Sequence, residues 1–186
     1  MYKRQVIKNK MTELNGVDYI GLSSSELHGR NFDQETSRSA VGQPIGSFFV
    51  YEADGLFQSD AEIQNYKNDR GELLQPNAKP GDIRFKDLNG DGVINSDDRD
   101  FKGNPLPDCS MGLTLGFNYK NFDVSAFFQG VFGNEVYNLT NYLGEFYNQA
   151  QYNKNSTILD AWRPDNTDTD IPRVTLDDPN NNIRPS

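Results

Sequence analysis

The sequence predicts an all-β fold in which short strands are separated by long polar loops and a few short helices. Three observations support this fold class. The chain of 186 residues is 12% aromatic and carries 16 glycines, yet its mean hydropathy of -0.76 is very polar. Apolar and polar residues alternate from Met111 to Gln129, and the shorter apolar run Ser47–Glu52 is bounded by glycine and proline. Such patterns are typical of strands between turns.

Charge and cysteine content narrow the function classes. The net charge of -9 argues against nucleic-acid binding, because phosphates would be repelled, and is compatible with cation binding. The single cysteine, Cys109, excludes an internal disulfide framework and provides no zinc spacing. No apolar run approaches the ~20 residues of a membrane-spanning helix, which leaves β-strand spans open because their hydropathy signal is weak. The basic first residues lack a following apolar stretch, so we expect no signal peptide.

The first elements are expected at the following places. Weak alternation predicts a strand from about Gln5 to Leu14, and residues 23–38 are expected to form a loop. The β-branched and aromatic run Ser47–Glu52 predicts a strand, after which Asp54-Gly55 is expected to turn the chain.

A short helix is expected next, over Ala61–Asn68. Ser59 and Asp60 are candidate N-caps, because a side-chain oxygen there can accept a hydrogen bond from a free N–H of the first turn. The helix is expected to end before Gly71, and a loop then leads to Gly81.

The stretch Gly81–Asp108 carries the most specific chemistry. Within it lies the D-x-N-x-D-G pattern of a calcium loop, in which alternate side chains converge on the ion and a glycine makes the sharp turn without strain. Calcium takes six to eight oxygens. The predicted ligands before Gly92 are the side chains of Asp87, Asn89 and Asp91. Those after it are the Val93 carbonyl, Asn95 through water, and Asp98 at the twelfth position.

Two features separate this loop from a helix-loop-helix calcium sensor. Asp98 is shorter than the usual glutamate, so we expect weak affinity, at roughly 10⁻⁴ to 10⁻³ M. The flanks are extended: Ile83–Lys86 alternates like a strand, and Asn104–Pro107 cannot continue a helix. We therefore predict a single calcium-type loop between extended segments; the alternative is a polar pair of Asx and glycine turns without metal.

Residues 110–132 predict a hairpin of two long strands around a tight turn at Lys120-Asn121. Strands of about nine or ten residues, tilted near 45°, match the hydrocarbon height of a membrane. A soluble sandwich would give the same alternation. The polar opposite face and the contrast between one tight turn and very long loops favour a wide barrel. The apolar face comprises Met111, Leu113, Leu115, Phe117, Tyr119, Phe122, Val124, Ala126 and Phe128.

The remaining segment is rich in aromatic and amide side chains. Helix-like spacing occurs at Glu135–Leu143 and at Ser156–Trp162, and Pro164 ends the second. The aromatic side chains could stack on a sugar or peptide, or pack the loop on itself; they are Tyr137, Tyr142, Phe146, Tyr147, Tyr152 and Trp162. We do not expect an enzyme, because the only histidine, His28, has no nucleophile pattern near it.

Several linked motifs resemble one family. In order, they are GQPIGSFFVYEADGLFQ, PGDIRFKDLNGDGVINSDDR, GNPLPD, GLTLGFNYKNFDVSAFFQGVFGNEVYN, AWRPDNTDTDIPR and DPNNNIRPS. Over about Val41–Ser186 the chain resembles the C-terminal part of the SusC/RagA-type TonB-linked outer-membrane transporters of Bacteroidetes. The resemblance implies an outer-membrane barrel of roughly 22 strands with an N-terminal plug. It also implies import of oligosaccharides or peptides, together with TonB and a SusD-like surface lipoprotein.

The resemblance implies a domain organisation. Residues 1–186 would be part of a receptor barrel domain, with an extracellular calcium-type loop at 81–108, a transmembrane hairpin at 110–132 and a long extracellular loop at 133–186. Four to six strands are too few to close such a barrel, so we expect a partial antiparallel transmembrane β-barrel, a fragment of the roughly 22-stranded one, that aggregates or needs detergent. The alternative is a secreted calcium-stabilised module that resembles a dockerin.

Overall fold

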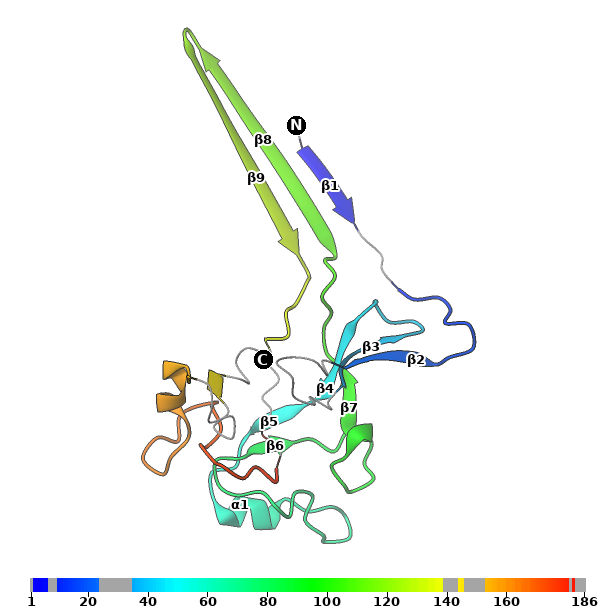
Figure 1. The fold of residues 1–186 in the computed structure, drawn as a ribbon, viewed down its shortest axis with the longest axis vertical. Coiled ribbons are helices and arrows are strands. Elements are labelled where there is room, and N and C mark those ends of the chain that lie inside the picture. The colour runs from blue at the N-terminus through cyan, green and yellow to red at the C-terminus, as the bar shows by residue number, and fades with distance from the viewer. Residues whose placement is uncertain are drawn as a thin grey trace. The chain divides into compact units, whose positions relative to one another are not determined.

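Strands dominate the regular secondary structure of the described residues, and long loops connect them, as the sequence predicts (Figure 1). The structure is a computed structural model that describes residues 2–6, 10–23, 35–138, 144–145, 153–180 and 182. Within these ranges the strands form three open sheets and no closed barrel. The elements are β1 (Tyr2–Val6), β2 (Tyr19–Ser23), β3 (Glu35–Ala40), β4 (Ser47–Tyr51), β5 (Ala53–Leu56), α1 (Asp60–Asn65), β6 (Ile83–Phe85), η2 (Ser96–Asp98), β7 (Arg99–Phe101), β8 (Cys109–Tyr119), β9 (Phe122–Phe132) and η3 (Ser156–Asp160).

The chain divides into two compact units, each made from separate parts of the sequence. The first unit comprises residues 1–49 and 101–136 and contains the long hairpin. The second unit comprises residues 50–100 and 137–186, so it joins the segment before the hairpin to the segment after it.

The hairpin of the first unit confirms the prediction and extends it. β8 and β9 pair antiparallel along their whole length, from Cys109 opposite Phe132 to Tyr119 opposite Phe122, around the two-residue turn. β1 pairs with the half of β8 that lies away from the turn, where Val6 lies opposite Cys109. The strand expected from Gln5 to Leu14 was placed too late, because β1 begins at Tyr2, where β8 provides a partner, and residues 10–14 carry only an isolated bridge at Met11. Residues 7–9 lie outside the described residues.

A second sheet runs in the order β2-β3-β4-β7. The prediction of loop up to residue 38 was wrong, because β3 begins at Glu35. Long-range contacts explain the difference. The Arg38 guanidinium lies 3.7 Å from the centroids of both the Tyr19 and the Phe49 rings, and it donates to the Glu35 carboxylate at 2.7 and 2.9 Å. This stack joins three strands, so a polar sequence forms a central strand.

The second unit packs around a small apolar core of Leu56, Ile83, Phe85 and Trp162. Three of these residues come from β5 and β6, which pair antiparallel. The turn predicted at Asp54-Gly55 was wrong: both residues lie within β5, at a register shift where Gly55 takes a φ of +83°. The glycine therefore serves a bulge, which the same local signal also favours.

The short helix α1 confirms Ser59 as its N-cap, since the Ser59 side chain accepts from the Glu62 N–H. It ends at Asn65 rather than Asn68. The side chain of Tyr66 explains the earlier end. Its ring lies edge-on to Phe57 at 5.6 Å, and its hydroxyl donates to the Phe85 carbonyl at 2.6 Å, which ties the next residue to β6.

The free edge of β6 is satisfied by amide side chains instead of a further strand. The Gln75 side chain accepts from the Phe85 N–H at 2.9 Å and donates to the Ile83 carbonyl at 3.0 Å. Asn182 accepts from the Ile83 N–H at 2.7 Å, and Asn180 donates to the Ile83 carbonyl at 2.9 Å. These contacts attach Asn180 and Asn182 to β6 across about half of the chain.

A buried carboxylate fixes the same junction. Asp82 is fully buried and accepts from Arg173 Nε at 2.6 Å, from Asn182 Nδ2 at 2.9 Å and from the Lys79 N–H at 2.8 Å. Trp162 adds a contact by donating its indole N–H to Gln58 at 2.8 Å. The residues after the hairpin are thereby held to those before it by charge, amide and ring contacts.

Gly81 offers a test of this packing. Its φ is +88°, and a Cβ there would overlap the Trp162 indole and lie 2.8 Å from Arg173 Cβ. Gly71 has a similar φ of +81° with nothing within 4 Å of that position. Both alanine substitutions should cost about 1–2 kcal/mol in backbone strain, and Gly81→Ala should cost more because it also displaces Trp162.

The measurement is denaturant unfolding of the chain in detergent micelles, followed by the fluorescence of Trp162, its only tryptophan. Gly81→Ala should lower the unfolding midpoint further than Gly71→Ala and change the emission of the folded state. Equal midpoints for the two variants and unchanged emission would contradict the close packing of Gly81 against Trp162.

Candidate functional site

The predicted calcium-type segment forms a tight loop over residues 87–98, which follows β6 and ends with η2. Its first carboxylate closes the first turn, since Asp87 accepts from the Gly90 N–H at 2.6 Å and from the Gly92 N–H at 2.8 Å. Gly92 takes a φ of +87°, which confirms the turn that the sequence predicts at this position. The Asn68 side chain supports the loop from outside by donating to the Gly92 carbonyl at 3.1 Å.

Asp91 lies at the centre of the loop. Its carboxylate accepts from the Val93 N–H at 2.9 Å and from the side-chain amides of Asn89 and Asn95 at 3.0 and 3.3 Å. These hydrogen bonds, with the Val93 N–H first and the Asn89 amide next, lower the pKa of Asp91. Three predicted ligand positions, Asn89, Val93 and Asn95, thus donate hydrogen bonds to the exposed carboxylate of a fourth, Asp91.

Asp98, the predicted closing ligand, is fully buried. One carboxylate oxygen accepts from the Leu88 N–H at 2.9 Å, and the other accepts from the Asn95 N–H at 2.7 Å. The Asn95 side chain caps η2 by accepting from the Asp97 N–H at 2.8 Å, and Asn95 and Asp98 together form a capping box on η2. Asp98 therefore holds the two ends of the loop together, and its role as a metal ligand stays a prediction.

The loop fits a hard cation in its chemistry. Among the residues that the structure describes, no three Asp, Glu, His or Cys side chains are grouped so that they could hold a metal ion. The loop provides carboxylate, amide and carbonyl oxygens instead, which is the donor set that calcium takes. The amides of Asn89 and Asn95 turn their nitrogens towards Asp91, so both would have to present their oxygens for a cation to bind.

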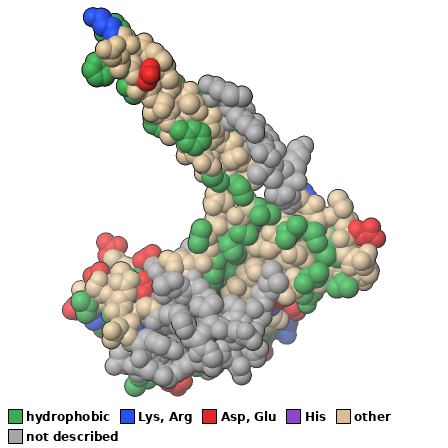
Figure 2. Space-filling model, turned by 45° about the horizontal axis from the view of Figure 1, so that its top comes forward, with side chains coloured by type: hydrophobic (Ala, Val, Ile, Leu, Met, Phe, Trp, Pro, Cys, Tyr) green, Lys and Arg blue, Asp and Glu red, His purple; other side chains and the backbone are tan. Residues whose placement is uncertain are grey.

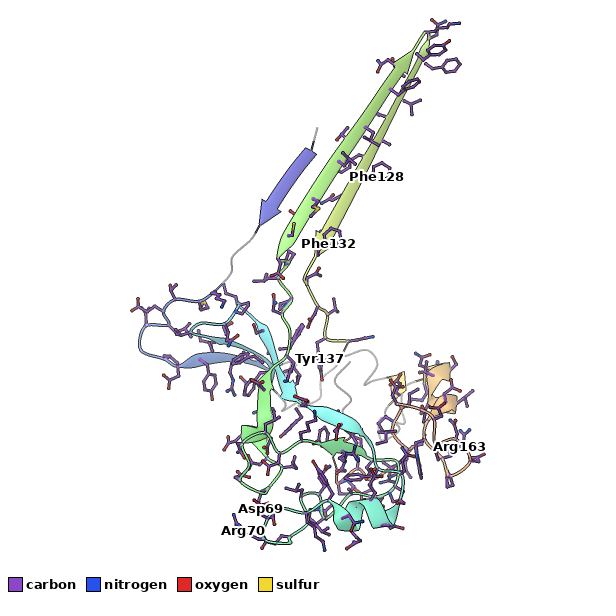
Figure 3. The ribbon with its side chains drawn as sticks, turned by 180° about the vertical axis from the view of Figure 1, so that it is seen from behind. Asp69, Arg70, Phe128, Phe132, Tyr137 and Arg163 are labelled. Carbon is purple, nitrogen blue, oxygen red and sulfur yellow. The ribbon has the colours of Figure 1, made fainter. Side chains whose placement is uncertain are left out.

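The hairpin brings both predicted apolar strand faces to one side of the sheet. Leu113 lies opposite Phe128, Leu115 opposite Ala126 and Phe117 opposite Val124. These side chains are open to the surroundings, with Phe117 65% and Phe122 71% exposed. Figure 3 shows Phe128 and Phe132 projecting from β9, and Figure 2 shows hydrophobic atoms exposed along this arm.

The other face of the hairpin is mostly polar, as the sequence predicts. Asn118 lies opposite Asp123, and Gly116 opposite Ser125. Phe127 and Val131 are the exposed large apolar residues on this face, and the Phe127 ring lies over Gly112, within 3.5–3.7 Å of the place of a Cβ. The hairpin therefore separates an apolar surface from a polar one, with a single aromatic interruption.

Both long segments leave the sheet at the same end. Val6, Cys109 and Phe132 lie side by side there, whereas the tight turn lies at the other end of β8 and β9. Residues 7–108 and the residues from 133 onward therefore both start from the end of the sheet that lies away from the tight turn.

Other predicted residues have mixed outcomes. Trp162 is buried in the core, which excludes it from a stacking surface for a ligand. The helix predicted at Ser156–Trp162 is the 3₁₀ turn η3, and residues 135–138 of the predicted helix Glu135–Leu143 have no regular structure. His28, residues 139–143, Phe146, Tyr147 and Tyr152 lie outside the described residues. Gln75 and Asn182 were missed, because a single amide in a polar segment carries no sequence signal.

The described residues contain no helix long and apolar enough to cross a membrane. No protein-family model matches the chain. Two similar proteins come from Formosa agariphila: TonB-dependent receptor P26 is 38% identical over 167 residues, and TonB-dependent receptor P3 is 37% identical over 169 residues. These alignments cover 90% and 91% of this chain and 16% of each receptor.

A third relative is TonB-dependent receptor SusC of Bacteroides thetaiotaomicron, which is 30% identical over 133 residues. That alignment covers 69% of this chain and 11% of SusC. The chain thus spans about a sixth or less of the length of these curated relatives.

Asp98 provides a test of the loop that needs no metal. In Asp98→Asn the new amide nitrogen cannot accept, so either the Leu88 or the Asn95 N–H is left unpaired in a buried place, at a cost of about 1–3 kcal/mol. Asp97→Asn is the matched control, since Asp97 is exposed beside it. Limited proteolysis without added calcium should cut Asp98→Asn within residues 87–98 sooner than wild type and the control. Equal cleavage of all three would show that Asp98 does not hold the loop closed.

Proposed function

The chain belongs to the SusC-type TonB-dependent receptors, which are outer-membrane proteins, and on this premise we propose that it supplies part of the barrel wall and extracellular loops of a transporter. The observation that carries the proposal is the register of β8 and β9, which gathers the apolar side chains on one face. An exposed apolar band of this size is unfavourable in water and favourable in a bilayer.

The hairpin supplies the membrane-facing wall in this proposal. Strands of 11 residues span about 36 Å, or about 26 Å along the membrane normal at a tilt near 45°, which matches the apolar band of outer-membrane barrels. The polar face then lines the interior. The side chains proposed to face lipid are Met111, Leu113, Leu115, Phe117, Phe122, Val124 and Phe128.

The two ends of the hairpin are assigned to the two sides of the membrane. Outer-membrane barrels have short periplasmic turns and long extracellular loops. The turn at Lys120-Asn121 is therefore periplasmic, and residues 7–108 and 133–186 are extracellular. The contacts of Asp82 and Trp162 support a common extracellular module built from both segments.

Transport itself is proposed for the whole receptor. It would import oligosaccharides or peptides together with a SusD-like surface lipoprotein, with energy passed from TonB to a region outside this chain. The support for these partners is the family resemblance and the receptor names of the relatives.

The calcium-type loop is proposed to stiffen the extracellular segment. The ion would be held by Asp87, Asn89, Asp91, Val93, Asn95 and Asp98, with affinity at roughly 10⁻⁴ to 10⁻³ M. Asp98 would also close the loop through its hydrogen bonds to the Leu88 and Asn95 N–H groups. The alternative, a dockerin-like secreted module, has little support, because the loop is flanked by the strands β6 and β7 rather than by helices.

Opposite faces of the hairpin give a test of the wall. Leu115→Arg places a charge on the proposed lipid face near mid-membrane and should disfavour folding into vesicles by about 2–4 kcal/mol. Ser125→Arg, at nearly the same height on the polar face, should fold almost normally. The measurement is the folded fraction of the full-length receptor in lipid vesicles, read as heat-modifiable migration on a gel. Equal folded fractions of the two variants would contradict the proposal that this face of the hairpin contacts lipid.

Calcium titration tests the loop. With the chain in detergent micelles, millimolar calcium should protect residues 87–98 from proteolysis in a saturable way. Asp87→Ala should abolish the protection, because it removes a proposed ligand, whereas Asp97→Ala in the same loop should retain it. No protection of wild type at millimolar calcium would leave the segment as a polar turn held by its own hydrogen bonds.

A further inference from the structure

The apolar face of the hairpin changes character at its turn. Beyond Leu115 and Ala126, aromatic rings occupy three of the last four positions: Phe117, Tyr119 and Phe122. The Phe117 and Tyr119 rings stack with centroids 6.4 Å apart, and Tyr119 lies directly opposite Phe122. Along the paired stretch from Met111 to Gly130, Tyr119 is the one residue of this face with a hydrogen-bonding side chain, and it stands at the very end.

Lys120 adds a positive charge at the same level. It is the first residue of the turn, with a φ of +52°, and its ammonium nitrogen lies 5.3 Å from the centroid of the Tyr119 ring. The charge is therefore folded back towards the aromatic, apolar face. Figure 2 shows basic atoms at the tip of the arm.

The neighbouring negative charge lies on the other face. Asp123 pairs with Asn118 on the polar side of the sheet, two positions from the turn in the sequence of each strand. The turn thus presents a cation with a phenol on the apolar side and a carboxylate on the polar side. The cation on the apolar face of the hairpin can therefore meet an anionic layer at the end of that face, because the carboxylate lies on the opposite face.

The length of the strands sets where that layer lies. If the 11 residues of β8 fill the hydrocarbon band, the band ends at Tyr119, and the next residue enters the headgroup region. Tyrosine and lysine at such a border place their apolar parts in the hydrocarbon and their polar tips in the headgroups.

We propose that Lys120 and the Tyr119 hydroxyl bind the phosphate of a glycerophospholipid headgroup in the periplasmic leaflet, and that this contact sets the depth of the hairpin. The inference rests on the proposed function, because it requires β8 and β9 to lie in the membrane wall. Lys120 supplies the charge for the phosphate, Tyr119 donates a hydrogen bond, and Phe122 covers the acyl chain beneath the headgroup.

The test uses the unmodified full-length receptor in two kinds of vesicle. One contains phosphatidylglycerol and phosphatidylcholine, and the other consists of digalactosyldiacylglycerol, which lacks phosphate. A small membrane-permeant reagent acetylates lysines, and mass spectrometry follows the rate at Lys120 and at Lys79, an exposed lysine of the extracellular segment. The ratio of the Lys120 rate to the Lys79 rate should be about fivefold lower with phospholipid, the factor that corresponds to about 1 kcal/mol for a lysine at an anionic surface.

Three outcomes would overturn the proposal. Lys120 and Lys79 could change by the same factor, which would show a general effect of the vesicle. Lys120 could react slowly in both lipids, which would show protection by protein. Inorganic phosphate could restore protection in the galactolipid vesicles, which would show a phosphate site that needs no lipid.

A separate measurement distinguishes failure of the wall itself. In the same vesicles, a Leu115→Cys receptor should resist a water-soluble maleimide, because position 115 lies within the hydrocarbon. Free labelling at this position would overturn the membrane-facing wall. Blocked labelling together with an unchanged Lys120 ratio would overturn the phosphate contact alone.

Discussion

The second unit depends on how the free edge of β6 and the buried Asp82 are satisfied. β6 is three residues long and has a strand partner on one side, β5. Its other edge would leave buried N–H and C=O groups unpaired, each at a cost of about 1–3 kcal/mol. Gln75, Asn180 and Asn182 supply those partners, and Arg173 balances the charge of Asp82. Because Asn182 bonds both to Ile83 and to Asp82, one amide joins the edge to the buried charge.

This arrangement explains how two segments separated by the hairpin share one core. Trp162 comes from the segment after β9 and packs on Leu56, Ile83 and Phe85 from the segment before β8. The hairpin places the starts of both segments at the same end of the sheet. The calcium-type loop follows β6 directly, and its conformation is therefore tied to the same strand that Asn182 and Gln75 hold.

The loop shows how one pattern serves two roles. The spacing of acids, amides and Gly92 that predicts a calcium site also produces a set of Asx-type hydrogen bonds that closes the loop without an ion. Asp98 contributes to the closing through two backbone N–H groups, so its carboxylate has a structural role in either case. A cation would add to a loop that is already folded, and weak affinity is the expected consequence of amides that must first turn.

The sequence by itself determined the elements whose signals are local. Strict alternation predicts β8 and β9 and the composition of their two faces, the serine before α1 predicts its cap, and glycine in the D-x-N-x-D-G pattern predicts the turn of the loop. Only the tertiary structure decided the rest. β3 is a strand because the guanidinium of Arg38 stacks between rings from two other strands, and Asp54-Gly55 is a bulge because β6 lies beside it. The burial of Trp162 and the pairing of Asn182 with Ile83 join residues many positions apart, and no local pattern encodes partners at that distance.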